Sequence, residues 1–336
     1  MTAKRSASRK VRYAVVGLGH ISQVAVLPAF KSAKNSELVA LVTGDPAKQK
    51  ALSRKYSVDR VYSYEQYDEC LSHGVDAVYI ALPNHLHCEY AVRAANAGVH
   101  VLCEKPMAVT EKECRQMIRA AEKNGVKLMV AYRLHFDEAN LEAIKLTQNG
   151  KLGEIRIFSS DFAQQVQKGN IRVTESSARG GGPIYDMGVY CINAARYLLR
   201  GDPIEVFAET VNNGEARFLG TEEMASVVMR FPNGQLATFT CSFGAAEIGR
   251  YTLVGTKGTL TADPGYDYAM PLKHEIVVNG KTAKKTFAKR DQFAAEIVYF
   301  RTASFVIAKR NHQGWKDWPT FASWKPSIAR RKAGKL

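Results

Sequence analysis

The first 132 residues alternate short apolar runs with amphipathic segments, and this alternation constrains the fold more than any other feature. The apolar runs are rich in β-branched residues. Amphipathic patterns between them predict helices, and Thr110 with Glu113 forms the capping-box pattern of a helix start. Buried strands joined by helices predict a parallel sheet covered on both faces, the doubly wound α/β class. The predicted strands are 12–17, 38–44, 76–82, 99–104 and 127–132, and the predicted helices are 86–97 and 111–124.

The second half has a different pattern. After a helical segment at 137–149, strand-like runs follow one another with turn residues such as 232–234 and 256–258 between them. Consecutive strands joined by short turns predict an open, mainly antiparallel sheet. We therefore expect a doubly wound domain followed by a second α/β domain with an open sheet. The predicted strands of this second domain are 154–162, 204–210, 225–231, 235–243 and 251–256.

Length and charge bound the organisation further. A chain of 336 residues with 46% hydrophobic content is long enough for two domains. The net charge of +15 is concentrated at the ends, because residues 1–12 carry +5 and residues 301–336 carry +8, which leaves +2 for the rest. A basic groove within the fold is therefore not expected, and no specific nucleic-acid partner is predicted. The predicted divisions are a basic tail at 1–11, a Rossmann domain at 12–132, a second domain at 133–300 and an atypical basic tail at 301–336.

Other classes are disfavoured by what the sequence lacks. No run of about 18 apolar residues predicts a membrane span, and the first residues show no secretory signal, so we expect a cytoplasmic protein without a membrane partner. The six cysteines form no C-x-x-C pair and no cluster with histidine. We therefore predict reduced thiols, no disulfide framework and no metal site.

A glycine-rich turn follows the first predicted strand, where Gly17 and Gly19 lie two residues apart. Such a turn lets a dinucleotide pyrophosphate approach the backbone at the start of the next helix. Ser22 stands in place of the third glycine and weakens the match, and a plain tight turn is the alternative. Its position after the first strand of a βα series favours the dinucleotide site.

The end of the second predicted strand bears on which nicotinamide cofactor binds. An acid there holds the ribose 2′-hydroxyl and repels a 2′-phosphate. This chain has Thr43 at that place, with Asp45 and Lys48 nearby. A hydroxyl and an ammonium suit a phosphate, so we predict NADP over NAD. The alternative is that Asp45 merely caps the next helix, and if Asp45 reaches the ribose instead, NAD is the cofactor.

The next two strands end in polar residues. Asn84 and His85 follow one strand, and Glu104, Lys105 and Pro106 follow the other. Ligands of open α/β sheets bind at the carboxyl ends of strands, so we expect these side chains at the cofactor site. A solvated surface lysine is the alternative for Lys105, but a Glu-Lys-Pro sequence at a strand end favours a function.

The stretch GGGPIYDMGVYCIN covers 180–193. Its glycines would let the backbone pass close to a ligand, and Pro183 suits the first turn of a helix over 183–199. Asp186 and Tyr190 are four residues apart and would share one helix face. They indicate either a buried tyrosine bonded to an acid or an acid/base site for a substrate hydroxyl.

Together, VVGLGHISQ, PNHLH, CEKPMA and GGGPIYDMGVYCIN resemble the Gfo/Idh/MocA oxidoreductases, most closely the glucose–fructose oxidoreductase-like branch. The resemblance implies nicotinamide-dependent oxidation or reduction of sugar or polyol hydroxyls, aldoses above all. It also implies a homo-oligomer, a dimer or tetramer, formed through the open sheet. Many members have histidine where Tyr190 stands, whereas this branch has tyrosine.

The resemblance implies Lys105, Asp186 and Tyr190 as the catalytic residues. A phenol has an ordinary pKa of about 10, and an ammonium nearby would favour its phenolate. Tyr190 is therefore the expected acid/base, Lys105 its electrostatic partner and Asp186 the substrate-orienting carboxylate. Arg133 and Asn193 are the expected substrate contacts. The expected cofactor contacts are Gly17, Gly19, His20, Ile21, Thr43, Lys48, Pro83, Asn84, His87, Glu104 and Lys105.

Residues 301–336 contain all three tryptophans and most of the excess charge. In a shifted reading frame that begins near Phe300, degenerate codons permit a segment that resembles the family's closing helix. We hypothesise a frameshifted tail; a divergent tail that binds an acidic partner is the alternative. For the whole protein, the alternatives to an enzyme are a non-catalytic nucleotide or sugar sensor of the same fold and salt-sensitive nucleic-acid binding through the tails.

Overall fold

The computed structural model describes residues 9–301, which form two compact units. Residues 9–133 and 291–301 make the first unit, and residues 134–290 make the second. The predicted boundary near 133 agrees with this division, but the predicted second domain at 133–300 is wrong at its end. Residues 291–301 return to the first unit, because their apolar side chains complete its core. The segments at 1–8 and 302–336, including nearly all of the tail hypothesised to be frameshifted, lie outside the described residues.

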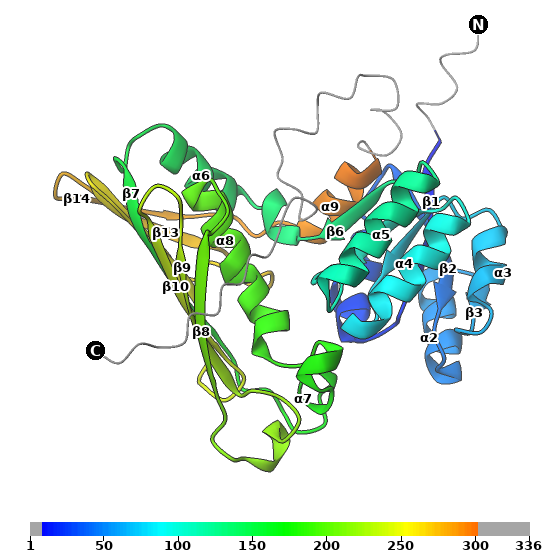
Figure 1. Ribbon diagram of the computed structural model, residues 1–336. Helices are drawn as coiled ribbons and strands as arrows, with labels where there is room; N and C mark the ends of the chain where they lie inside the picture. Colours follow the sequence, from blue (N-terminus) through cyan, green and yellow to red (C-terminus); the bar gives the residue numbers. More distant parts are fainter. Residues whose placement is uncertain (1–8, 302–336) are drawn as a thin grey trace, which may run out of the picture. The chain divides into compact units, whose positions relative to one another are not determined.

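The first unit is built on six parallel strands in the order β3-β2-β1-β4-β5-β6 (Figure 1). This order reverses beside β1, as in doubly wound sheets that bind dinucleotides. The predicted parallel sheet is confirmed, and β3, three residues long, is an addition to it. The strands are β1 (Val11–Val16), β2 (Ser36–Val42), β3 (Arg60–Tyr62), β4 (Ala77–Ile80), β5 (His100–Glu104) and β6 (Leu128–Ala131).

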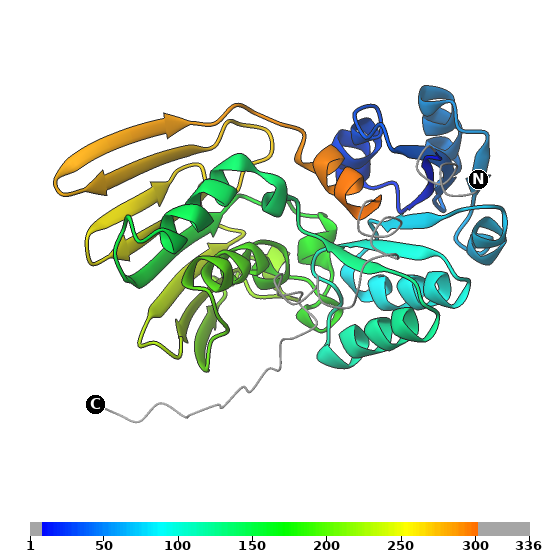
Figure 2. The ribbon, with the colours of Figure 1, turned by 90° about the horizontal axis from the view of Figure 1, so that it is seen from above.

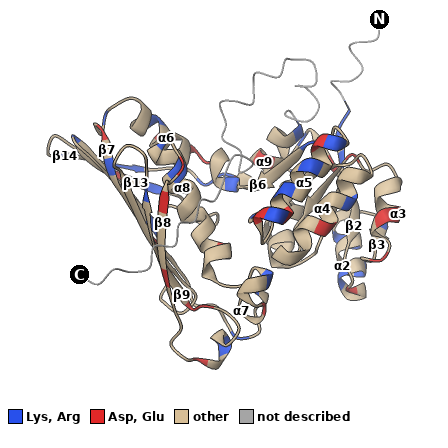
Figure 3. Cartoon of the chain, viewed as in Figure 1, with Lys and Arg blue, Asp and Glu red and all other residues tan. Residues whose placement is uncertain are grey.

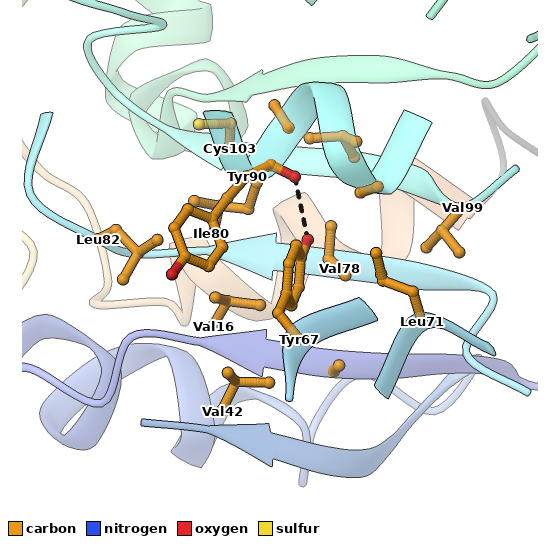
Figure 4. Close-up of a cluster of buried hydrophobic side chains, with 14 of the residues drawn as sticks. Val16, Val42, Tyr67, Leu71, Val78, Ile80, Leu82, Tyr90, Val99 and Cys103 are labelled. Carbon is orange, nitrogen blue, oxygen red and sulfur yellow. Dashed lines mark hydrogen bonds between the residues drawn. The ribbon is translucent and has the colours of Figure 1, made fainter. Parts of the chain in front are cut away.

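Helices cover both faces of this sheet. On one face, α3 (Tyr67–Ser72), α4 (His87–Asn96) and α5 (Glu111–Lys123) enclose a core of alternate strand residues such as Val16, Val42, Val78 and Ile80 (Figure 4). Within it the Tyr67 hydroxyl donates to the carbonyl oxygen of Tyr90 at 3.1 Å, which satisfies a buried polar group. The capping box predicted at Thr110 and Glu113 is present at the start of α5.

The opposite face is closed by segments that lie far apart in the sequence. The η1 turn (Ser22–Val26), α1 (Leu27–Ala29) and α9 (Gln292–Arg301) pack there. The ring of Tyr13 lies between Phe30 and Phe300, with centroids 5.4 and 6.4 Å away. Helix α2 (Pro46–Tyr56) packs beside β2 and β3. The last described helix is thus part of the Rossmann core.

The second unit contains eight strands in the order β14-β13-β12-β11-β7-β10-β9-β8. All pairs are antiparallel except β7 with β10. This confirms the predicted open sheet and adds three strands, β12 to β14. The strands are β7 (Ile155–Ala163), β8 (Glu205–Val211), β9 (Met224–Arg230), β10 (Leu236–Ser242), β11 (Ile248–Gly255), β12 (Gly258–Ala262), β13 (Lys273–Val278) and β14 (Lys281–Thr286).

One face of this sheet is covered and the other is open. Helices α6 (Glu138–Gln148) and α8 (Val189–Leu199) pack together along one side of it (Figures 1 and 2). Buried and exposed residues alternate along β9 accordingly. The open face carries exposed apolar side chains, among them Ile157, Phe207, Val228 and Leu236. An oligomer through this face remains a prediction.

Acidic and basic side chains are interspersed over the helices of both units (Figure 3). Many form pairs, such as Arg93 Nε with Asp68 Oδ1 at 3.0 Å and Arg250 Nε with Asp161 Oδ2 at 3.2 Å. This mixture agrees with the small net charge of the central part of the chain.

Candidate active site

The two glycines of the turn after β1 have different surroundings. Gly17 has φ +91°, and a Cβ there would lie 2.5 Å from the carbonyl oxygen of Ala81, so only glycine fits the turn. Gly19 is exposed, and a Cβ there would meet nothing within 4 Å. The first glycine therefore serves the chain's own packing, and the second leaves room beside the backbone for a ligand.

Ser22, which stands where the motif has its third glycine, is part of the turn's packing. It is fully buried, and its hydroxyl donates to the Gly17 carbonyl oxygen at 2.5 Å, which ties the turn to the start of η1. His20 is exposed and Ile21 half-buried on this turn. The geometry fits a bound pyrophosphate, because an open glycine precedes the N–H groups at a helix start. The contacts predicted for His20 and Ile21 stay predictions.

Asp45, at the end of β2, is the N-cap of α2. Its Oδ1 accepts from the backbone N–H groups of Ala47 at 3.0 Å and Lys48 at 3.1 Å. The Lys48 Nζ is 3.4 Å from Asp45 Oδ2. The bond from the Lys48 backbone is the main cause that lowers the pKa of Asp45. Asp45 therefore caps α2, which is the alternative that the sequence left open for it. Thr43, at the predicted cofactor-selecting position just after β2, is buried.

His87 connects the loops that follow β4 and β5. Its ring is fully buried, with Nδ1 2.8 Å from the Pro106 carbonyl oxygen and Nε2 2.9 Å from that of Leu82. Burial lowers the pKa of His87. The ring therefore supports the two loops, and the cofactor contact predicted for His87 stays a prediction. Pro83 and Asn84, on the loop that follows β4, are both half-buried.

Glu104 and Lys105 follow β5 as predicted. The hydroxyl of Tyr79 donates to Glu104 Oε1 at 2.7 Å, and the backbone N–H of Lys105 donates to Glu104 Oε2 at 3.3 Å. Burial raises the pKa of Glu104, and the Lys105 ammonium opposes that shift. Glu104 is thus held from two sides next to Lys105.

Arg133, at the end of the first unit's contiguous segment, is buried. Its Nη1 donates to Gln292 Oε1 of α9 at 2.5 Å. The sequence predicts a substrate contact for Arg133, whereas the structure gives it a bond to a helix 159 residues further along the chain. The substrate contact stays a prediction.

The glycine stretch of the second unit packs on its own chain. Gly182 has φ +95°, and a Cβ there would lie 2.5 Å from Thr221 Oγ1. A Cβ at Gly181 would collide with the carbonyl group of Glu175. Protein atoms therefore occupy the space that a side chain at Gly181 or Gly182 would need, and the close approach of a ligand to this backbone stays a prediction.

Asp186 and Tyr190 lie on a continuous helix, as predicted, but its first part is wider than an α-helix. Asp186 is in a π-helical turn, Ile184–Gly188, and Tyr190 is in α8. Single π-helical turns often occur at functional sites. Tyr190 is 7% exposed and its ring lies 5.7 Å from that of Phe162 and 6.2 Å from that of Tyr266.

Arg172 is a site residue that sequence reasoning missed. Its Nε is 2.9 Å from Asp186 Oδ2, and the Asp186 side chain is 11% exposed. Arg172 lies on the short helix α7 (Ile171–Thr174), whose N-cap is Asn170. The Asn170 cap signal was in the sequence, but nothing in the spacing connects Arg172 with Asp186.

Asn193, the second predicted substrate contact, is fully buried on α8. Neither its Oδ1 nor its Nδ2 has a hydrogen-bond partner among residues 9–301. An unsatisfied buried amide costs about 1–3 kcal/mol, so such groups call for an explanation. The role of Asn193 toward a substrate stays a prediction.

The predicted residues thus fall into two groups. Gly17, Gly19, Thr43 and Lys105 lie at the carboxyl ends of the first unit's strands. Asp186, Tyr190 and Asn193 lie on one helical stretch of the second unit. The meeting of Lys105 with Tyr190 across the two units stays a prediction. Within the described part of the chain, no group of three or more His, Cys, Asp or Glu residues could hold a metal ion.

The fold and the glycine turn define a dinucleotide-binding α/β protein with a second, open-sheet unit. Residues 11–132 match the model of the oxidoreductase family with an NAD-binding Rossmann fold, and residues 140–261 match the GFO/IDH/MocA C-terminal domain. The chain belongs to the Gfo/Idh/MocA family of NAD(P)-dependent oxidoreductases, as the sequence motifs predicted.

Two of the similar proteins are named as sugar enzymes. The D-xylose 1-dehydrogenase [NADP(+)] of Haloarcula marismortui is 30% identical over 86% of this chain and 82% of its own. The aldose–aldose oxidoreductase of Caulobacter crescentus, solved with glycerol, is 36% identical with a TM-score of 0.81, over 86% of this chain and 88% of its own. An uncharacterized oxidoreductase of Rhizobium meliloti is 34% identical over 75% of this chain and 74% of its own.

Among residues 9–301, no helix is long and apolar enough to span a membrane.

Proposed function

We propose that this protein is an NADP-dependent oxidoreductase that acts on an aldose or a related polyol. The names of two relatives support the substrate class, since one is a xylose dehydrogenase and the other an aldose–aldose oxidoreductase. The catalytic residues in this proposal are Lys105, Asp186 and Tyr190.

The observation that carries the cofactor proposal is the state of Asp45. Its Oδ1 accepts two backbone N–H groups at the start of α2, which supports a capping role for this carboxylate rather than a ribose contact. Thr43 and Lys48 then offer a hydroxyl and an ammonium to a 2′-phosphate. The nicotinamide group, when bound, accepts or supplies the hydride. The proposed contacts are Gly17, Gly19, His20, Ile21, Thr43, Lys48, Pro83, Asn84, Glu104 and Lys105, with His87 holding the loops beneath them.

Proton transfer is assigned to Tyr190. A base must take the hydroxyl proton of the substrate as hydride leaves its carbon, and a phenolate stabilised by the Lys105 ammonium can do this. The ion pair with Arg172 orients the carboxylate of Asp186, which can then accept a hydrogen bond from a sugar hydroxyl. Arg133 and Asn193 are proposed to contact the substrate. This arrangement requires the two units to bring Lys105 and Tyr190 together.

The proposal is tested by following nicotinamide absorbance with NADP and then NAD over a panel of aldoses, ketoses and inositols. We expect turnover with NADP and an aldose. Tyr190→Phe should lower kcat by about a hundredfold or more, because general acid–base catalysis contributes a factor of 10²–10⁴. Tyr56→Phe is the matched control, since the Tyr56 hydroxyl has no hydrogen-bond partner among the described residues. Near-normal turnover in Tyr190→Phe would refute the assignment.

A non-catalytic sensor is the competing function. It predicts that NADP and sugar bind, as calorimetry would detect, without any change in absorbance at 340 nm across the whole panel. Binding without turnover in the wild-type protein would therefore replace the enzyme proposal by the sensor.

A homo-oligomer is proposed to form through the open face of the second sheet. The support is the exposed apolar side chains of Ile157, Phe207, Val228 and Leu236, because large exposed apolar groups often mark interfaces. Light scattering on the purified protein would measure the assembly directly.

A further inference from the structure

A buried carboxylate, that of Glu296, and a half-buried one, that of Glu104, share one phenol in the first unit. The Tyr79 hydroxyl, on β4, lies 2.7 Å from Glu104 Oε1 at the end of β5. The same hydroxyl lies 3.4 Å from Glu296 Oε1, which comes from α9. Tyr79 and Glu296 are both 0% exposed. Three segments distant in sequence thus bring an acid of α9 into contact with the network next to Lys105.

The hydrogen count decides how this network is bonded. A phenol has one hydrogen, and the shorter distance gives it to Glu104. The contact between Tyr79 and Glu296 is then favourable when Glu296 carries a proton that it donates to the phenol oxygen. If both carboxylates were ionised, they would compete for one hydrogen and repel each other.

The surroundings of Glu296 favour the protonated acid. Its Oε2 has no hydrogen-bond partner within the described part of the chain. Burial raises the pKa of Glu296 well above its ordinary value and the charge of Glu104 raises it further, against smaller opposing effects of Tyr79 and Arg133. The other ionisable groups at this place are Tyr13, whose pKa burial also raises, and Lys105, which acts on Glu104.

We propose that Glu296 is a positioning residue that keeps its proton at neutral pH and, through Tyr79, holds the Glu104 carboxylate beside Lys105. The Glu104 Oε2 accepts the backbone N–H of Lys105 at 3.3 Å, so a displaced Glu104 would release the residue assigned to catalysis. The inference rests on the proposed role of Lys105. It gives the returning helix α9 a function beyond covering the sheet.

The first test is stability against pH, which requires no substrate. A group whose pKa is raised on folding stabilises the protein below its unfolded pKa, and that contribution is lost as the pH rises. Urea unfolding at pH 5 and pH 8 should therefore show Glu296→Gln gaining on the wild type as the pH rises, because an amide does not ionise. The exposed Glu122 offers the matched control Glu122→Gln, with no such trend. Parallel pH profiles of wild type and Glu296→Gln would overturn the proposal.

The second test separates positioning from packing. We expect Glu296→Leu, which removes the donor, to lower kcat about tenfold with the KM for sugar changed less than twofold. Glu296→Gln retains a donor and should stay within about threefold of the wild type at pH 7. In a Tyr79→Phe background the two variants should become equal, because the connecting hydroxyl is gone. A difference that persists there, or equal activities in the wild-type background, would refute the connection through Tyr79.

The two tests keep this inference separate from the function proposed above. If the wild type turns over no sugar, the enzyme proposal fails while the pH profiles of stability still decide the protonation of Glu296. If the enzyme is active and the profiles are parallel, only the inference about Glu296 fails.

Discussion

The two sheets of this protein differ in how many of their faces are covered. The six-stranded parallel sheet has helices on both faces, and Val78 and Tyr79, neighbours on β4, are both fully buried on opposite sides. The eight-stranded sheet has helices on one face, so Val227 is buried while its neighbour Val228 is 39% exposed. The difference shows why the same residue type contributes unequally to stability in the two sheets. A valine of the first sheet lies in the core, whereas a valine of the second can lie on the surface.

The strongest test of this comparison exchanges matched valines for aspartate. Val78→Asp buries an unpaired charge, and we expect a loss of more than about 4 kcal/mol, enough to prevent folding. Val228→Asp should change the stability of a single chain by less than about 0.5 kcal/mol, because the site is exposed. Urea unfolding measures both. Light scattering on Val228→Asp adds a second result, since a smaller assembly would support the proposed interface.

The covered face of the second sheet contains a buried histidine. His274 on β13 is 2% exposed, neither ring nitrogen has a hydrogen-bond partner among residues 9–301, and burial lowers its pKa to about 4. Between about pH 4 and pH 6.5, His274 therefore binds a proton in the unfolded chain but not in the folded chain. Stability should be full above about pH 6.5 and fall by roughly 3 kcal/mol as the pH drops toward 4.

His274→Phe should remove most of that slope, which unfolding measured between pH 7 and pH 4 would show. The exposed His20 gives the control, because His20→Phe should leave the slope unchanged. An unchanged slope in His274→Phe would mean that other groups cause the acid sensitivity.

The glycines of the first unit's turn offer a smaller effect. Gly17→Ala places a methyl group against Ala81 at a positive φ and should cost about 2 kcal/mol of stability. Gly19→Ala meets open space, so its stability should stay within about 0.5 kcal/mol of the wild type, while the added methyl group should weaken NADP binding. Thermal unfolding and fluorescence titration with NADP measure the two effects. Equal losses in both variants would contradict the division of tasks between the glycines.

The smallest expected effect concerns the second unit's ion pair. Arg172→Met removes the partner of Asp186 and should lower kcat/KM for sugar about tenfold, or ~1.4 kcal/mol, without changing NADP affinity. Arg156→Met breaks an exposed pair with Glu154 and should have no measurable effect. If Arg172→Met weakened NADP binding instead, Arg172 would not be acting through Asp186.

Much of the first unit could be predicted because most of its strands have a clear local sequence pattern. Continuous apolar runs and the cap at Thr110 are local signals, and they placed five of the strands in the first sheet, with β3 too short to produce one. In the second sheet, β14 was missed because its sequence KTAKKT is exposed along its whole length and has no apolar alternation. Only pairing with β13 makes it a strand.

The candidate site divides in the same way. Gly17, Lys105, Asp186 and Tyr190 could be found from motifs, since each stands in a short recognisable pattern. Arg172 could not, because its partner is 14 residues away across a turn with no regular spacing. The capping by Asp45 was foreseen as an alternative, and the structure decided in its favour.

The sequence by itself determined the class of fold, the family and the residue types available for catalysis, because strand patterns and glycine turns follow from local backbone chemistry. Only the tertiary structure decided that α9 belongs to the first unit, that His87 supports loops and that Glu296 meets Tyr79. Those facts depend on burial and on contacts between distant segments. Side chains far apart in sequence acquire their pKa values and hydrogen-bond partners only when the chain packs.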